Sequence, residues 1–251
     1  MDSNVKEKIL ILAFEITKRN MNMNKNIPIT RTFASIMFFV LTICSYGQND
    51  NRFPVWTFHK RNVNIHGLSV GLVSTVIDER NTNTNGIKLE LIGVGLFVPL
   101  IPEFPTFEEQ RSERINGLSL SALGTVCDCL TNGLSIGGGS QLNYQVNGIA
   151  LATMVNISEK QNGIMIATGN FTKITNGFQL GLTNGSSKIN GVQIAFSVNE
   201  SEKVRGLQIG IVNKTENLRG VQIGIWNVNE KRKLPLINWN FRRTKERETN
   251  E

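Results

Sequence analysis

Few residues of this chain have the type and spacing that catalysis needs. The 251 residues include two histidines, His59 and His66, and neither belongs to a Ser/His/Asp set or to a recurring pair of carboxylates. Cys127 and Cys129 form a Cys-x-Cys pair, which could close a small disulfide ring or stay reduced on one face of a strand. Without a second cysteine pair or a histidine cluster, a zinc site would lack ligands. The sequence therefore predicts no enzyme, no catalytic residue, no metal site and no cofactor.

Side-chain amides, in contrast, recur at a regular interval. Six asparagines are spaced 14 or 15 residues apart: Asn156, Asn170, Asn184, Asn199, Asn213 and Asn227. Stacked amides can hydrogen-bond to one another along a column. We therefore predict an inner asparagine ladder, with the alternative that these residues only turn the chain.

The amides belong to a repeat that fills most of the chain. Each copy is a glycine, usually after Asn or Arg, followed by an apolar, any, apolar, small and apolar residue. The ten copies are separated by 19, 31, 16, 15, 15, 14, 14, 15 and 14 residues, and they begin at Gly67, Gly86, Gly117, Gly133, Gly148, Gly163, Gly177, Gly191, Gly206 and Gly220. Self-similarity at a short, nearly constant period indicates a stacked repeat protein.

The period within each copy is that of a strand. Apolar residues alternate, as at Leu207, Ile209 and Ile211, which indicates a strand with one buried face. Identical units at one period favour parallel stacking, because an antiparallel meander would alternate two kinds of unit. The sequence predicts an all-β fold, a parallel β-solenoid of about ten rungs of 14–15 residues with these apolar residues inside. An antiparallel meander or barrel is the alternative.

With the apolar positions inside, a polar face is expected outside. The second outward position of the later copies holds Gln179, Gln193, Gln208 and Gln222. The residue four after the glycine is small in nine of ten copies. We predict that glutamines and small residues form a flat docking face for a glycan or a partner sheet. The alternative is that the small residues serve close packing within the chain itself.

The ends of the repeat need caps, because a stack of rungs leaves unpaired edges. We expect residues 48–66, around Trp56, to form an N-terminal cap on a repeat domain of residues 67–229. Residues 230–251, around Trp239, are expected to form a C-terminal cap and a basic tail. Prolines exclude residues 99–114 from a central strand, so this segment is predicted to be a loop that folds over the sheet or grips a partner.

The N-terminal region has the pattern of a secretory signal. Residues 23–47 contain a basic start, a short apolar run and small residues before a cut after Gly47. Residues 1–22 fit no such pattern and are predicted to lie upstream of the true start. We therefore predict an exported protein that begins at Gln48, in which Cys127 and Cys129 meet an oxidising compartment.

The charge does not favour a nucleic-acid partner. The formal net charge is +7, but the excess lies in the N-terminal region and the C-terminal tail and not along the repeats. Basic residues that bind nucleic acid form a stripe on the folded surface. We expect no nucleic-acid binding.

The units Gly220-Val-Gln-Ile-Gly-Ile-Trp-Asn227 and Asn132-Gly-Leu-Ser-Ile-Gly137, with Lys231–Phe241, resemble the bacterial surface-repeat proteins built from GxQIGxxN-type repeats. Members of that family carry export signals and have no assigned activity. The resemblance implies a periplasmic, outer-membrane or cell-surface protein that acts as a structural or binding scaffold. The candidate partners are a cell-surface glycan or an envelope protein, and membrane association is compatible with the sequence. The alternatives are an outer-membrane β-barrel and a carbohydrate-active solenoid enzyme.

Overall fold

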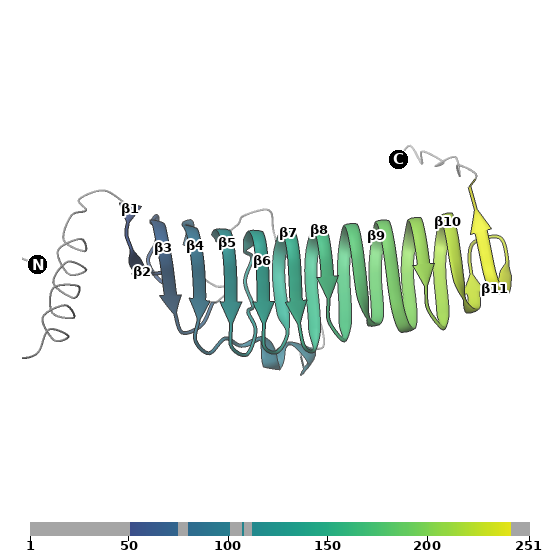
Figure 1. Ribbon diagram of the computed structural model, residues 1–251, viewed down its shortest axis with the longest axis horizontal. Coiled ribbons are helices and arrows are strands. Elements are labelled where there is room, and N and C mark those ends of the chain that lie inside the picture. Colours follow the sequence, from purple (N-terminus) through teal and green to yellow (C-terminus); the bar gives the residue numbers. More distant parts are fainter. Residues whose placement is uncertain (1–50, 75–79, 101–106, 108–111, 242–251) are drawn as a thin grey trace, which may run out of the picture. The chain divides into compact units, whose positions relative to one another are not determined.

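The computed structural model describes residues 51–74, 80–100, 107 and 112–241, and these form a β-solenoid (Figure 1). Its elements are one 3-10 helix and eleven strands: β1 (Asn51–Arg52), β2 (Val55–Thr57), β3 (Asn64–Gly71), β4 (Thr82–Glu90), η1 (Gly95–Leu100), β5 (Glu113–Ser121), β6 (Leu130–Gly137), β7 (Gln141–Ala152), β8 (Val155–Ile166), β9 (Gly169–Ile209), β10 (Val212–Val228) and β11 (Lys233–Asn240). The longest strand, β9, continues through several turns of the coil (Figure 1).

The rungs stack in the same direction and in register on the repeat glycines. From β3 to β10, every pair of neighbouring strands is parallel, and Gly67 faces Gly86, which faces Gly117. The register continues to Gly220, which faces Gly206. The parallel solenoid predicted from the glycine spacing is confirmed, and for the described residues the antiparallel meander and barrel are excluded.

The interior of the coil is polar, contrary to expectation. Among the described residues, 36 polar or charged residues are buried against 18 hydrophobic ones. Leu207 and Ile209 are only half-buried, and Ile211 is exposed, whereas Gln208 is fully buried. The strand alternation was predicted correctly, but the assignment of its two faces was wrong. Hydrogen bonds between polar side chains replace hydrophobic contacts in much of this core.

The six predicted asparagines form a hydrogen-bonded column inside the coil. The Nδ2 of Asn170, Asn184, Asn199 and Asn213 donates to the Oδ1 of the next asparagine at 2.8–3.0 Å. Asn156 donates to Asn170 at 3.4 Å. Each of these five amides also donates to a backbone carbonyl ten residues further on, so the ladder ties together neighbouring rungs as well as the two sides of one rung.

Asn199→Ala is expected to lower the free energy of unfolding by about 2–4 kcal/mol, because it leaves the Asn213 Oδ1 and the Ile209 carbonyl without their donor. Asn227→Ala, at the end of the ladder, is expected to cost about 1 kcal/mol, because Asn227 only accepts from Asn213 and donates to Gly224. Urea denaturation monitored by circular dichroism measures both losses. Equal losses for the two variants would contradict a cooperative ladder.

A second asparagine ladder runs along the outside and was not predicted. It consists of the residue before the repeat glycine in seven successive rungs, from Asn85 to Asn190. Each Nδ2 donates to the Oδ1 of the preceding member at 2.6–2.8 Å. These amides are half-buried. In the last two rungs Arg205 and Arg219 occupy this position.

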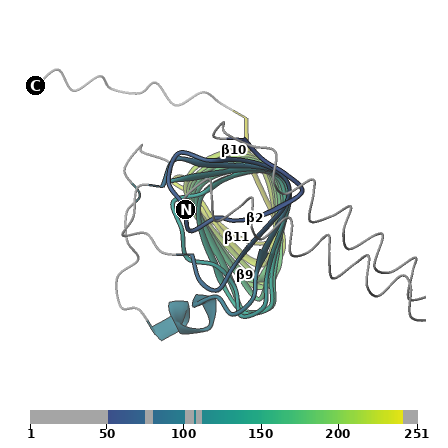
Figure 2. The ribbon, with the colours of Figure 1, turned by 90° about the vertical axis from the view of Figure 1, so that its left-hand side faces the viewer.

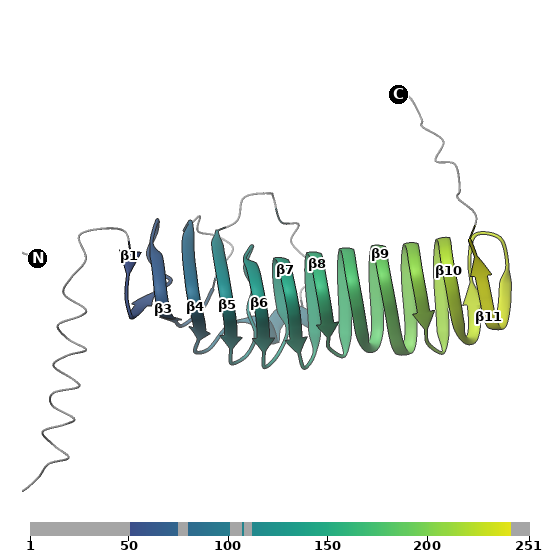
Figure 3. The same ribbon diagram turned by 45° about the horizontal axis from the view of Figure 1, so that its top comes forward.

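The two ends of the coil are closed in different ways. At the N-terminal end β1 and β2 pair with β3, and Phe58 is fully buried over the first rungs. At the C-terminal end the chain turns back, so that β11 pairs antiparallel with β10 (Figure 3). Asn238 of β11 is fully buried and donates to Gln222 Oε1 at 3.2 Å. Trp226 and Trp239 are about half exposed, so amides and not tryptophans fill the C-terminal cap.

The proline-rich segment leaves the stack where expected. The helix η1 lies outside the coil (Figure 2), and Phe107 packs against the buried cluster of Val98, Leu142 and Ile157. This contact agrees with folding over the sheet. Strand β5 already begins at Glu113, so the predicted end of the loop at residue 114 was two residues too late. Ile101 and Phe104 of this loop lie outside the described residues.

Other predicted boundaries agree less closely or fall outside the described part of the chain. The repeat begins at Asn64, inside the predicted N-terminal cap, and β10 ends at Val228. The predicted upstream segment 1–22, the signal 23–47 and the tail after Phe241 lie outside the described residues. Within the described ranges, no helix has the length and hydropathy of a membrane span.

Candidate binding face

The outward side of one strand in every rung is aliphatic. One and three residues after each of the ten repeat glycines stands Leu, Ile, Val or Phe, from Leu68 and Val70 to Val221 and Ile223, and none of these side chains is buried. Five residues after the glycine, six rungs have a large exposed apolar residue, and the other four have Ala122, Gly138, Thr153 or Thr168. The six are Leu72, Leu91, Leu182, Phe196, Ile211 and Ile225. We call these three columns the aliphatic face.

The aliphatic face is large for a surface that contacts nothing. Ten rungs at the usual strand separation give a length of about 43 Å, and the three columns span about 13 Å along the strand. The area is therefore roughly 600 Å², at the upper end of the largest apolar patches of soluble monomers. The most exposed side chains lie near the C-terminal end, where Phe196 is 73% and Ile225 67% exposed.

Strand β11 extends the aliphatic face beyond the last rung. Ile237 lies opposite Ile223 and Trp239 lies opposite Val221 in the antiparallel pair. Both side chains are about half exposed. Residues that face each other across a strand pair point to the same side of the sheet. Arg232 stacks over the Trp239 ring at 4.6 Å, so the face ends beside a cation.

Basic residues border the aliphatic face in five of the ten rungs, and most of them lie in the last three rungs. One and three residues before the repeat glycines, the outward charged residues are all basic: Arg114, Lys160, Lys188, Lys203, Arg205 and Arg219. We call these six residues the basic strip. Acidic residues begin at the next corner of the coil, with Glu159, Glu202 and Glu216. In the rungs that contain a residue of the strip, the strip and the aliphatic face thus occupy two parts of the same strand.

The side of the coil away from the aliphatic face carries charges of both signs. Lys214 and Glu200 form an exposed ion pair at 2.5 Å, and this hydrogen bond raises the pKa of Lys214. At the corner next to the basic strip, Lys173 and Glu159 form a further ion pair at 2.6 Å. The coil is therefore amphipathic, with apolar side chains on one side and compensated charges on another.

The glutamines do not form the outward docking face predicted from the sequence. Gln179, Gln193, Gln208 and Gln222 are all 0% exposed. Each later member donates its Nε2 to the Oε1 of the preceding one at 2.7–2.8 Å. They form a second inner ladder and are unavailable to a glycan or a partner sheet.

In the later rungs, the glycines four after the repeat glycine leave room for the inner asparagine ladder. A Cβ added to Gly181 would lie 2.8 Å from Asn170 Nδ2, and one added to Gly210 would lie 2.8 Å from Asn199 Nδ2. A larger side chain would displace the amides. The alternative that these residues serve the packing of the chain itself is therefore confirmed.

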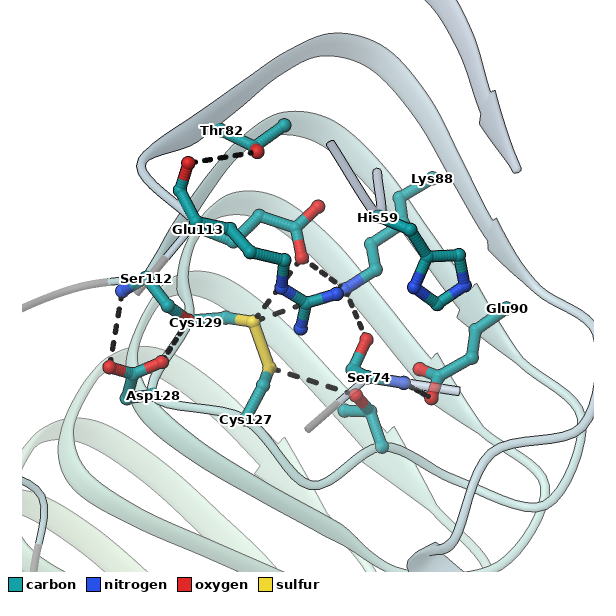
Figure 4. A network of polar contacts seen from close by, with 12 residues as sticks. His59, Ser74, Thr82, Lys88, Glu90, Ser112, Glu113, Cys127, Asp128 and Cys129 are labelled. Atoms are coloured by element: carbon teal, nitrogen blue, oxygen red, sulfur yellow. Dashed lines mark hydrogen bonds and ion pairs between the residues drawn. A yellow bond between two sulfur atoms is a disulfide. The ribbon is translucent and has the colours of Figure 1, made fainter. Parts of the chain in front are cut away.

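The first rungs enclose a charged cluster that sequence reasoning missed (Figure 4). Lys88 Nζ lies 2.6 Å from Glu113 Oε2 and donates to Ser74 Oγ at 2.8 Å, and both charged side chains are almost completely buried. The backbone amide of Ser74 donates to Glu90 Oε1. The Lys88 ammonium also lies 4.5 Å from the centre of the Phe58 ring, which covers the cluster from the N-terminal end.

Cys127 and Cys129 form a disulfide next to this cluster. The sequence left open whether the two cysteines are reduced or joined, and in the structure they are joined. Both cysteines are buried, and Cys129 Sγ lies 3.9 Å from Lys88 Nζ. Between them, Asp128 accepts hydrogen bonds from the backbone amide and hydroxyl of Ser112. These two hydrogen bonds join the residue before β5 to the segment before β6.

His59 lies at the edge of the charged cluster. Its Nε2 accepts a hydrogen bond from the Leu72 backbone amide at 3.2 Å, which requires this nitrogen to be unprotonated. Burial lowers the pKa of His59, and the nearby Arg80 and Lys88 charges lower it further against the opposing effect of Glu113 and Glu90. His59 is thus held neutral as an acceptor.

The remaining arrangement of reactive groups suggests no particular reaction. In the described ranges, no three His, Cys, Asp or Glu side chains are grouped so that they could hold a metal ion. Comparisons of the chain with protein-family models, with curated proteins and with solved structures found no match.

Proposed function

We propose that this chain is an exported repeat scaffold, without catalytic activity of its own, that binds a partner along the aliphatic face. The observation that carries this proposal is the unbroken alignment of outward aliphatic side chains in all ten rungs. An exposed apolar patch of this extent normally marks an interaction surface. The hydrogen-bonded interior supports the proposal because the ladders hold the outward columns in register.

Export is supported by two features of the chain. Residues 23–47 have the pattern of a secretory signal. Disulfides persist in oxidising compartments and are rare in reducing ones, and the Cys127–Cys129 bond fits an exported protein. The resemblance to bacterial surface-repeat proteins, carried by units such as Gly220–Asn227, agrees with the same location.

Fractionation of bacterial cells that express the full chain tests the proposal. We expect the protein in the envelope fraction, with Gln48 as the N-terminal residue. The triple variant Phe196→Ser/Ile211→Ser/Ile225→Ser removes three of the exposed apolar side chains. It is expected to move at least about tenfold more protein into the soluble fraction, because association driven by apolar surface scales with its area.

The matched control is Glu200→Ser/Lys214→Ser, which removes the exposed ion pair on another side of the coil and leaves the net charge unchanged. This variant is expected to fractionate as the wild type does. A wild-type protein found wholly in the soluble fraction would contradict binding through the aliphatic face. An N-terminus before Phe33 on the recovered protein would contradict export through the proposed signal.

A further inference from the structure

We infer that the partner of the aliphatic face is an anionic lipid surface, an inference that rests on the proposed function. The coil would lie on the bilayer with its aliphatic columns at the boundary between headgroups and acyl chains. The basic strip would then meet the headgroup phosphates.

The chemistry of the aliphatic face fits acyl chains. The columns one and three residues after the glycines consist of Leu, Ile, Val and Phe, which offer no side-chain hydrogen bonds. Such a face gains free energy by leaving water, with no polar group to leave unsatisfied. A face that bound sugar hydroxyls would need donors and acceptors among these columns.

The arrangement of charge points to an anionic surface. One and three residues before the repeat glycines, every outward charged residue is positive and none is acidic. These residues lie two to eight residues along the strand from the aliphatic columns. That separation corresponds to about 7–26 Å, so residues such as Arg205 and Arg219 stand at the border of the apolar surface. Proteins that lie in a membrane interface combine an apolar face with Lys and Arg in this way.

The C-terminal end of the face has the side chains expected at a membrane interface. Trp239 and Ile237 continue the aliphatic face on β11, and Trp226 stands beside the last column. Tryptophan is enriched at the level of lipid headgroups because its ring is amphipathic. Arg232, stacked on Trp239, adds a positive charge at the same place.

A second copy of the chain is the competing occupant, and the charges disfavour it. Two aliphatic faces packed together would approach the roughly 800 Å² per partner of a standard interface. The corresponding outward positions of the second copy hold no acidic residue, however, so they would not neutralise the basic strip. An anionic lipid surface satisfies both the apolar columns and the strip.

Vesicle flotation with the protein purified from the exporting cell tests this inference. We expect the protein to float with vesicles of phosphatidylcholine and phosphatidylglycerol at 7:3 (roughly a physiological anionic fraction), and at least about tenfold less with phosphatidylcholine alone. Salt of about 0.5 M should reduce binding to the anionic vesicles, because it screens the charges of the basic strip. Trp226 and Trp239 fluorescence should shift to shorter wavelength on binding.

Two variants separate the parts of the surface. Phe196→Ser/Ile211→Ser/Ile225→Ser should lower binding to anionic vesicles about tenfold or more, and Arg205→Gln/Arg219→Gln should abolish most of the preference for anionic lipid. Glu200→Ser/Lys214→Ser serves again as the control. All substituted side chains point outward, so we expect the variants to be as stable as the wild type. Unchanged midpoints of urea denaturation would show that they remain folded.

The outcomes distinguish this inference from the proposed function. No flotation with either vesicle, or binding unaffected by the aliphatic substitutions, overturns the lipid partner. If the wild type instead sediments as a dimer and the triple variant as a monomer, the occupant is a second copy. In either case, the proposed function stands if the wild type stays in the envelope fraction and the triple variant leaves it. If the wild type is not retained in the envelope fraction, both the proposed function and the lipid partner are overturned.

Discussion

Lys88→Met is expected to lower the free energy of unfolding by about 3–5 kcal/mol, because it leaves the Glu113 carboxylate buried without its ammonium partner. Lys88 Nζ lies 2.6 Å from Glu113 Oε2, and the two side chains are 1% and 0% exposed. Glu113 Oε1 makes no hydrogen bond in the described part of the chain. Methionine keeps most of the volume and the contact with the Phe58 ring, so the loss reports the charge. Urea denaturation at neutral pH provides the measurement.

A double variant separates the charge from the packing. Lys88→Met/Glu113→Gln removes both charges while keeping the length of residue 113 and most of the volume of residue 88, and it is expected to recover stability to within about 1–2 kcal/mol of the wild type. Glu113→Gln alone should resemble Lys88→Met, because it leaves the ammonium buried. If Lys88→Met cost less than about 1 kcal/mol, the pair would behave as an exposed ion pair and the cluster would not be closed to water.

The stacking of the rungs could be predicted from the sequence because it depends on a positive φ angle at one position of every rung. The repeat glycines have φ between 125° and 155°, which other residues rarely adopt, so the glycine had to recur in every rung. The spacing of Asn156–Asn227 likewise predicted the inner ladder. Both signals are periodic and do not depend on which side of the strand faces the core.

The alternation of apolar and polar residues alone could not predict which side of each strand faces the interior of the coil. A period of two separates two faces but does not say which is buried, and the apolar face was placed inside because that is the rule for soluble proteins. Here Gln208 is buried and Ile211 exposed. The small residue four after the glycine was the available signal, because Gly210 is small to make room for the asparagine ladder.

The buried ionic cluster was missed because its members are scattered in sequence. Glu113 is 25 residues from Lys88, across the irregular proline-rich loop. Only the register reveals that Lys88 lies between Ser69 and Ser119 inside the coil. Glu90, in a column that is otherwise small, was a visible departure from the repeat, and it accepts a hydrogen bond from Ser74 in the same cluster.

Gly177→Ala is expected to destabilise the protein by about 3–5 kcal/mol, through backbone strain and a steric clash that act together. Gly177 has φ of 140°, and an added Cβ would lie 2.1 Å from the Gly163 carbonyl oxygen. Because that carbonyl belongs to the backbone of the neighbouring rung, relief requires the two rungs to separate. In a stacked repeat, the loss of one interface weakens the coupling of the rungs on both sides. Hydrogen exchange should therefore rise in the rungs around residues 163 and 191.

Gly169→Ala is the matched control, because Gly169 lies in the same strand, β9, without a positive φ. The nearest atom to its added Cβ is on the Phe171 ring at 3.0 Å, and that side chain can move. The expected change is less than about 1 kcal/mol, since alanine also restricts the unfolded chain. Equal losses of unfolding free energy for the two variants would mean that the repeat glycines matter only because they are small. A selective loss for Gly177→Ala would show that the close approach of successive glycine backbones holds the rungs, and with them the aliphatic face, in register.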